Sequence, residues 1–370
     1  MRVAGLDPRQ AMKWSARLGT FAGIDVFVHV TFLALLAYFA LVFWTQTGTL
    51  GGVLTGLALI VMLFGCVLLH EFGHALTARR FGIRTKYITL LPIGGLAMLE
   101  SMPRDPRQEI IVALAGPAVN LVIAAIVFVL ILVAGQAGSL LSLDIQRAGL
   151  LESLLAANLI LAVFNMLPAF PMDGGRVLRA ALSMRMDRVR ATRAAASIGR
   201  ALAVGLGFLG LAGNPFLILI AVFVWIGAGA EASAVEVDER LADQPASRAM
   251  ITDFQVIDPH APLSRAIDLT LAGTQKDFPV LARDGALVGV LTQAAILHGL
   301  RDLGAEGTVA QVMKPVKSAA PTTPLAQLLA DLQDGEGRLV CILSGGRLVG
   351  VVDLENISEF LRIRAALAGR

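Results

Sequence analysis

Charged residues and cysteines are both scarce in this chain of 370 residues. Hydrophobic residues make up 56% of the sequence and charged residues 16%, and the mean hydropathy is +0.72. This composition exceeds what the core of a soluble domain can absorb, so it indicates a membrane protein. The only cysteines, Cys66 and Cys341, exclude a disulfide framework and a cysteine zinc cluster, which is compatible with a reducing cytosol.

Six apolar segments, each near the ~20 residues that a bilayer helix requires, predict a polytopic α-helical membrane domain. They are residues 26–46, 52–80, 108–134, 149–170, 197–213 and 215–232. Residues 1–21 mix basic and polar side chains without a clear cleavage site, so we expect no cleaved signal peptide.

Basic residues predict the orientation of these spans. They concentrate between the second and third spans and between the fourth and fifth, while the other loops hold almost none. Cytosolic loops are the ones that carry an excess of Lys and Arg, so both termini are expected in the cytosol. The net charge of +3 therefore needs no nucleic-acid partner. The residues concerned are Arg79, Arg80, Arg84, Lys86, Arg104 and Arg107, then Arg176, Arg179, Arg185, Arg188, Arg190 and Arg193.

The last third of the chain has the composition of a soluble domain and contains a repeat. Residues 278–292 match residues 339–353, and Met250 has a counterpart in Met313. Each copy reads strand, turn, strand, helix, with a glycine-containing pair, Asp284-Gly285 or Gly345-Gly346, at the hairpin turn.

A tandem repeat of this size resembles a pair of cystathionine-β-synthase-type (CBS) domains. That resemblance implies a soluble α/β fold in which the two copies associate, and domains of this kind often bind adenosine nucleotides. We expect a membrane-embedded domain over residues 1–235, a first CBS repeat over 246–305 and a second over 308–365.

The second apolar segment contains the sequence His70-Glu71-Phe72-Gly73-His74. On a helix, histidines four residues apart project from one face, so two neutral imidazoles can hold one Zn²⁺ while Glu71 reaches the metal-bound water. Polar groups of this kind are expensive to bury in lipid, so they indicate a functional site. The alternative is a set of helix-packing polar residues that satisfy one another.

A catalytic zinc commonly has three protein ligands, and Asp173 is the candidate for the third. It lies within a segment, residues 165–175, in which two prolines and two glycines prevent a regular helix, and irregular backbone at membrane depth implies a cavity. At ~1.5 Å per residue, His74 and His70 lie about 7 and 13 Å below the cytosolic surface. Asp173 reaches a similar depth just before Arg176. The alternative for Asp173 is a helix C-cap that faces water.

These two motifs resemble those of the site-2 protease family of membrane zinc metalloproteases, in the prokaryotic form with C-terminal CBS domains. The sequence HEFGH matches the family's HExxH, and residues 165–175 resemble its NxxPxxPxDG motif. Residues 90–100 and the sequence Gly116-Pro117-Ala118-Val119-Asn120 also look like family features.

The resemblance implies a role for each matched residue. His70, His74 and Asp173 would bind one zinc ion, and Glu71 would act as the general base. Asn165 would polarise the scissile carbonyl or hold the substrate strand, with a helix-packing asparagine as the alternative.

The implied activity is hydrolysis of a peptide bond within or near a transmembrane segment of a membrane-protein substrate, in regulated intramembrane proteolysis. A helical peptide bond is shielded by its own hydrogen bonds, so the substrate must unwind locally. Residues 90–99 could pair with the extended substrate as an added strand, or form a re-entrant plug.

The CBS pair is expected to be regulatory or dimerising, which would give a homodimer. An adenosine nucleotide is a possible ligand, but the G-x-x-T-x-x-D pattern of nucleotide-binding CBS domains is incomplete. Ala295 replaces the aspartate of the first copy, and Asp353 and Asn356 replace the threonine and aspartate of the second. The alternative function is a divalent-metal or ion transporter with regulatory CBS domains.

Overall fold

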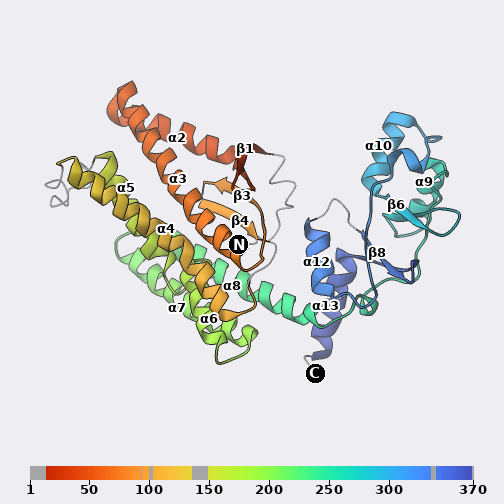
Figure 1. Cartoon of the computed structure of the whole chain (residues 1–370). Coiled ribbons are helices and arrows are strands. Elements are labelled where there is room, and N and C mark those ends of the chain that lie inside the picture. Colours follow the sequence, from red (N-terminus) through yellow and green to blue (C-terminus); the bar gives the residue numbers. More distant parts are fainter. Residues whose placement is uncertain (1–13, 93, 100–102, 136–148, 335–338, 369–370) are drawn as a thin grey trace. The chain divides into compact units, whose positions relative to one another are not determined.

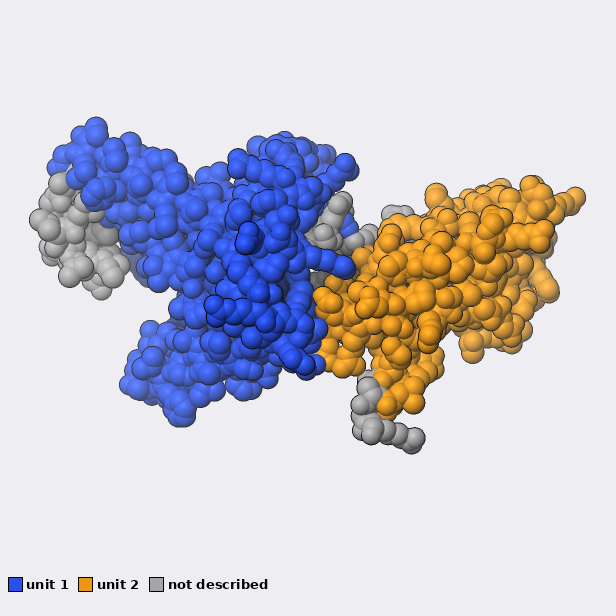
Figure 2. Space-filling model, turned by 60° about the horizontal axis from the view of Figure 1, so that its bottom comes forward, with its two compact units in different colours: residues 1–235 blue, residues 236–370 orange. Residues whose placement is uncertain are grey.

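The structure is a computed structural model that describes residues 14–92, 94–99, 103–135, 149–334 and 339–368. Contacts within the chain divide it into two compact units, Met1–Val235 and Glu236–Arg370 (Figure 2). The boundary between the units falls inside one helix, α8 (Phe216–Ala242).

The first unit is built mainly from apolar helices (Figure 1). Among the described residues, five helices are long and apolar enough to cross a membrane. They are α2 (Val30–Thr47), α3 (Leu50–Arg80), α4 (Pro106–Val133), α7 (Arg188–Ala212) and α8. The helical membrane domain is therefore confirmed.

The fourth predicted span, 149–170, is represented by a shorter helix, α5 (Leu150–Asn165), of 16 residues. At 1.5 Å per residue its length is about 24 Å. The helix ends where the proline-containing segment begins, and the chain turns there into a further short helix, α6 (Asp173–Ser183). Helix α4 packs against α3, α5 and α6, so it forms the centre of this unit.

A four-stranded sheet beside α3 was not predicted. Its strands are β1 (Ser15–Phe21), β2 (Ile24–His29), β3 (Thr85–Leu91) and β4 (Gly94–Leu99), in the order β1-β2-β3-β4. Strands β2 and β3 are parallel, and the other pairs are antiparallel.

Two sequence interpretations are corrected by this sheet. The first span begins at Val30 and not at residue 26, because residues 24–29 form β2. Alternate side chains of β2, those of Ile24, Val26 and Val28, are buried, as the two-residue period of a strand requires. Residues 90–99 are also not a simple loop, because they contain the end of β3 and all of β4, which is an edge strand among the described residues.

The second unit has an α/β fold, as predicted. Its hairpins, β5 with β6 and β8 with β9, turn at the two glycine-containing pairs that the sequence indicates. The strands are β5 (Phe278–Leu281), β6 (Leu287–Leu291), β7 (Lys317–Ala319), β8 (Leu339–Ser344) and β9 (Arg347–Asp353). The helices are η3 (Ala246–Arg248), α9 (Leu263–Ala272), α10 (Gln293–Leu303), α11 (Val309–Val312), α12 (Leu325–Asp334) and α13 (Leu354–Ala368).

The equivalent methionines of the two repeats, Met250 and Met313, each pack against the other repeat. A β-carbon on Gly350, in the second repeat, would lie 2.7 Å from the sulfur of Met250 in the first. A β-carbon on Gly289, in the first repeat, would lie 3.2 Å from the sulfur of Met313. Each methionine therefore packs on the hairpin of the other repeat, and glycine is required there because the sulfur approaches the backbone closely.

Candidate metal centre

The histidines of the HEFGH sequence lie on one face of α3, as their spacing predicts. His70 and His74 are 6% and 4% exposed, so both imidazoles are inside the membrane unit and not at its lipid-facing surface. Asp173 is 6% exposed and is the first residue of α6. The C-cap alternative for Asp173 is therefore wrong, because this residue begins a helix.

The segment that delivers Asp173 folds tightly back on itself. Residues 166–172 turn between α5 and α6, and Gly174 and Gly175 lie directly against that turn. A β-carbon on Gly174 would be 2.5 Å from the carbonyl carbon of Met166, and one on Gly175 would be 2.6 Å from that of Ala169. The two glycines after Asp173 are thus required by close backbone contact.

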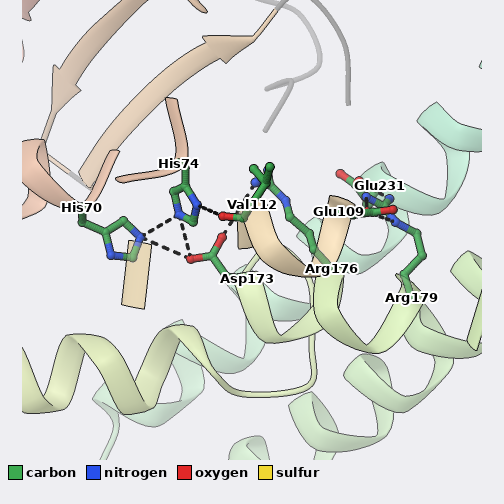
Figure 3. Close-up of polar contacts among 8 residues, drawn as sticks. All are labelled: His70, His74, Glu109, Val112, Asp173, Arg176, Arg179 and Glu231. Carbon is green, nitrogen blue, oxygen red and sulfur yellow. Dashed lines mark hydrogen bonds and ion pairs between the residues drawn. The ribbon is translucent and has the colours of Figure 1, made fainter. Parts of the chain in front are cut away.

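Three ligand atoms converge at this point (Figure 3). Nε2 of His70 and Nε2 of His74 are 3.1 Å apart. Oδ2 of Asp173 lies 3.2 Å from Nε2 of His70 and 3.1 Å from Nε2 of His74. Ligand atoms about 2.0–2.1 Å from a tetrahedral zinc would be about 3.3 Å from one another, so these separations fit a zinc ion with a fourth position left open.

The other ring nitrogen of each histidine is hydrogen-bonded to α4. Nδ1 of His70 donates to Oδ1 of Asn120 at 2.5 Å, and Nδ1 of His74 donates to the backbone oxygen of Val112 at 2.7 Å. These bonds place the protons on Nδ1 and leave the lone pairs of both Nε2 atoms directed at the common space. The donor set is therefore that of a metal-binding site.

Glycines allow α4 to approach the imidazoles. A β-carbon on Gly116 would lie 2.6 Å from Nε2 of His70 and would also overlap the ring of His74. On α3, a β-carbon on Gly73 would lie 2.8 Å from the backbone oxygen of Ala115. The space between the rings is thus kept open by the absence of a side chain at Gly116.

The two predicted catalytic residues have different surroundings. Glu71 lies against strand β4, because a β-carbon on Gly95 would be 2.5 Å from Cγ and 3.2 Å from Oε1 of Glu71. Asn165 is half-buried at the end of α5, and in the described part of the chain it makes no hydrogen bond with the three ligand residues.

A buried ion-pair cluster beside the metal centre was missed. The side chain of Arg179 on α6 is fully buried, and it donates from Nε to Glu109 at 2.8 Å and from Nη1 to Glu231 at 2.5 Å. Burial alone would lower the pKa of Arg179, but the two carboxylates outweigh it and raise that pKa above its ordinary value. The sequence analysis assigned Arg179 only to membrane topology. The available signals were Glu109 in the first turn of α4 and Glu231 inside α8.

Comparisons with known proteins show the family of the chain. The family model described as Peptidase family M50 matches residues 58–149 and 141–206, and the CBS domain model matches residues 246–302 and 309–363. A zinc metalloprotease of Methanocaldococcus jannaschii is 31% identical over 360 residues, which cover 95% of this chain and 97% of that one. The protein Rip3 of Mycobacterium tuberculosis is 30% identical, over 95% of this chain and 94% of its own.

Among solved structures, a site-2 protease from Methanocaldococcus jannaschii is 34% identical and matches with a TM-score of 0.44. The match covers 59% of this chain and 95% of that one. A membrane-embedded His-His-Asp site, followed by a CBS pair, defines a class of membrane zinc metalloproteases. The chain belongs to peptidase family M50, as a multi-pass membrane zinc metalloprotease of the site-2 protease type.

Proposed function

We propose that this chain hydrolyses a peptide bond within or near a transmembrane segment of a membrane-protein substrate, in regulated intramembrane proteolysis. The observation that carries the proposal is the convergence of His70, His74 and Asp173 with ligand-atom separations of 3.1 to 3.2 Å. All three are buried, and Glu71 lies beside the two histidines on α3. The convergence of three ligand atoms on one point, with a glutamate next to them, suits hydrolysis better than an ion pathway.

The residue roles follow from the donor set. His70, His74 and Asp173 would hold the zinc ion, which when bound supplies a Lewis acid and lowers the pKa of its water. Glu71 takes a proton from the attacking water and passes it to the leaving amine. Asn165 polarises the scissile carbonyl or holds the substrate strand.

The position of β4 supports a strand-pairing route for the substrate. Strand β4 is an edge strand among the described residues, and the Glu71 side chain lies against Gly95 within it. A substrate segment that has unwound exposes backbone donors and acceptors, which an edge strand can pair. The substrate would then be held extended beside the catalytic glutamate.

The topology and the CBS pair complete the proposal. The basic loops favour a cytosolic position for both termini, which would make the CBS pair a cytosolic regulatory or dimerising module. Asp353 and Asn356 hydrogen-bond to each other's backbone N–H at 2.9 and 3.1 Å. These side chains are thus already engaged at the start of α13, which favours dimerisation over binding of an adenosine nucleotide. Calorimetry of the full chain with ATP, ADP and AMP tests this point. Heat of binding with any of them would support nucleotide binding by the CBS pair.

The test of the protease activity compares wild type with Glu71→Gln, using detergent-purified protein, a transmembrane reporter substrate and zinc analysis. We expect Glu71→Gln to retain zinc, because Glu71 is not a ligand, and to cleave about 10²–10⁴-fold more slowly. Glu239→Gln, at an exposed position of α8, is the matched control and should behave as wild type.

Equal cleavage by wild type and Glu71→Gln, or the absence of zinc from both, would refute the protease proposal. Ion-transport assays in vesicles would then be the next experiment.

A further inference from the structure

Two asparagines that are not metal ligands lie fully buried between the membrane helices. Asn120 on α4 and Asn158 on α5 are both 0% exposed. A buried side-chain amide without partners is costly, and more so where neighbouring helices are apolar. The sequence analysis gave Asn158 no role, although an asparagine in the middle of an apolar helix was a signal.

The two amides connect the metal centre to the backbone of α5. Nδ1 of His70 donates to Oδ1 of Asn120 at 2.5 Å, and Nδ2 of Asn120 donates to Oδ1 of Asn158 at 2.9 Å. Nδ2 of Asn158 donates to the backbone oxygen of Leu154 at 2.9 Å and to the sulfur of Cys66 at 3.4 Å. We call this series of hydrogen bonds, from Leu154 through Asn158 and Asn120 to His70, the amide relay.

The direction of every bond in the amide relay is set at its α5 end. The backbone oxygen of Leu154 can only accept, so the amide nitrogen of Asn158 must face it and the amide oxygen must face Asn120. Asn120 then has to present its nitrogen to Asn158 and its oxygen to His70. An oxygen facing Nδ1 of His70 requires the proton to be on Nδ1, which leaves Nε2 free for a metal.

His70 needs this anchoring more than His74 does. His74 is oriented by the backbone oxygen of Val112, which cannot exchange an acceptor for a donor. His70 is oriented by a side-chain amide, which can rotate by half a turn and present its nitrogen instead. Among the residues that the structure describes, the bond to Asn158 is what distinguishes the two orientations of Asn120.

We propose that Asn158 is a positioning residue for the metal centre, which fixes His70, through Asn120, in the tautomer that offers Nε2 to zinc. The proposal rests on the proposed function, because it takes His70 as a zinc ligand. It adds a residue that touches neither the metal nor the substrate, and it assigns that residue to metal affinity.

The first variant to test is Asn158→Leu, which is similar in size and removes both ends of the amide. Without the hydrogen bond to Asn158, the amide of Asn120 can rotate and turn its nitrogen toward Nδ1 of His70. This orientation favours the His70 tautomer with its proton on Nε2. Partners that orient metal ligands typically contribute 10–100-fold to affinity, so we expect zinc affinity to fall by about that factor. Affinity is measured on the detergent-solubilised full chain by competition with a chelator.

A packing control separates orientation from stability. Ile131 is fully buried in the same cluster as Cys66 and Leu154 and has no polar atom in its side chain. Ile131→Ala removes volume from this cluster without touching the amide relay. We expect it to lower the thermal midpoint at least as much as Asn158→Leu while zinc affinity stays at the wild-type value.

A rescue variant tests the polarity argument directly. In Asn120→Asp, either carboxylate oxygen accepts from Nδ1 of His70, so no anchoring is needed. The carboxylate would however face the amide oxygen of Asn158, and Asn158→Leu removes that repulsion. We therefore expect Asn120→Asp/Asn158→Leu to bind zinc more tightly than Asn158→Leu alone.

The outcomes are distinguishable from a failure of the proposed function. A wild type that holds no zinc overturns the proposed function and this inference with it. Equal zinc affinity of wild type and Asn158→Leu overturns the proposed role of Asn158 and leaves the proposed function standing. So does a double variant that binds zinc no better than Asn158→Leu, because loss of packing could not be reversed by a change at Asn120.

Discussion

Gly116 provides the sharpest test of the space between the two imidazoles. In Gly116→Ala the added β-carbon would lie 2.2 Å from Nε2 of His74 and 2.6 Å from Nε2 of His70, whereas ordinary contacts begin at 3.4 Å, so even the less crowded His70 ring must withdraw by about 0.8 Å. The backbone of α4 cannot retreat from this contact without losing its packing on α3. The displacement therefore falls on the rings, and it separates their Nε2 atoms from Asp173.

The magnitude follows from the tolerance of metal coordination. Metal-ligand distances hold within about 0.2 Å, and the displacement of about 0.8 Å is four times that value. A change that only disturbs partners of the ligands costs up to about 100-fold in affinity, so moving the ligands themselves should cost more. We expect Gly116→Ala to lose more than about 100-fold in zinc affinity and to lose cleavage with it.

The assay is chelator competition together with reporter cleavage, and Gly65→Ala is the matched control. Gly65 lies on α3 close to His70, and a β-carbon there would have nothing within 4 Å. Alanine is the better helix former, so the control should fold at least as well as wild type and keep its zinc. Wild-type zinc affinity in Gly116→Ala would refute the geometry assigned to the metal centre.

Three further predictions concern other parts of the molecule. Arg179→Met removes the ion pairs of Arg179 with buried Glu109 and partly buried Glu231, leaving Glu109 only Arg188 at 3.8 Å, and should destabilise the membrane unit by about 3–5 kcal/mol, whereas Arg190→Met, at an exposed ion pair, should cost less than about 1 kcal/mol; thermal unfolding in detergent compares them. Gly95→Val should abolish cleavage with zinc retained, because its side chain displaces Glu71 and not a ligand; undiminished cleavage would exclude the strand-pairing route. Burial raises the pKa of the Cys341 thiol from 9.0 to about 12, so iodoacetamide should modify it at pH 8 only after unfolding. The unfolded thiol releases its proton first, so the contribution of Cys341 to stability is complete below pH 9.0 and is lost as pH rises toward 12.

The local motifs were predictable because each depends on the helical repeat or on the backbone restrictions of its own residues. The four-residue spacing of His70 and His74 places both on one face of any helix, and the two prolines before Asp173 together with the two glycines after it disfavour a continuous helix. The CBS repeats were readable because one copy could be compared with the other. These features need no knowledge of the tertiary structure.

What was missed depends on partners that are distant in the sequence. Strand β2 runs directly into the apolar helix α2, so its second half, with Val26 and Val28, was read as part of the first span. Arg179 meets glutamates from two other helices, and no local pattern predicts which arginine of a basic loop turns inward. Asn158 had a local signal, but its partner could be named only once α4 and α5 were known to be adjacent.

The positions of the ligands are set by directional contacts between helices and not by apolar burial. Lipid tails are as apolar as leucine, so burial alone gives neighbouring membrane helices no preferred register. Here glycine contacts between α3 and α4 set the distance between the helices, while hydrogen bonds from α4 set the rotation of each imidazole. Arg179, six residues beyond Asp173 on α6, connects that helix to α4 and α8. Helix α4 therefore contacts or bonds to every element that supplies a ligand, and substitutions on it should alter zinc affinity more than equally buried substitutions on α7.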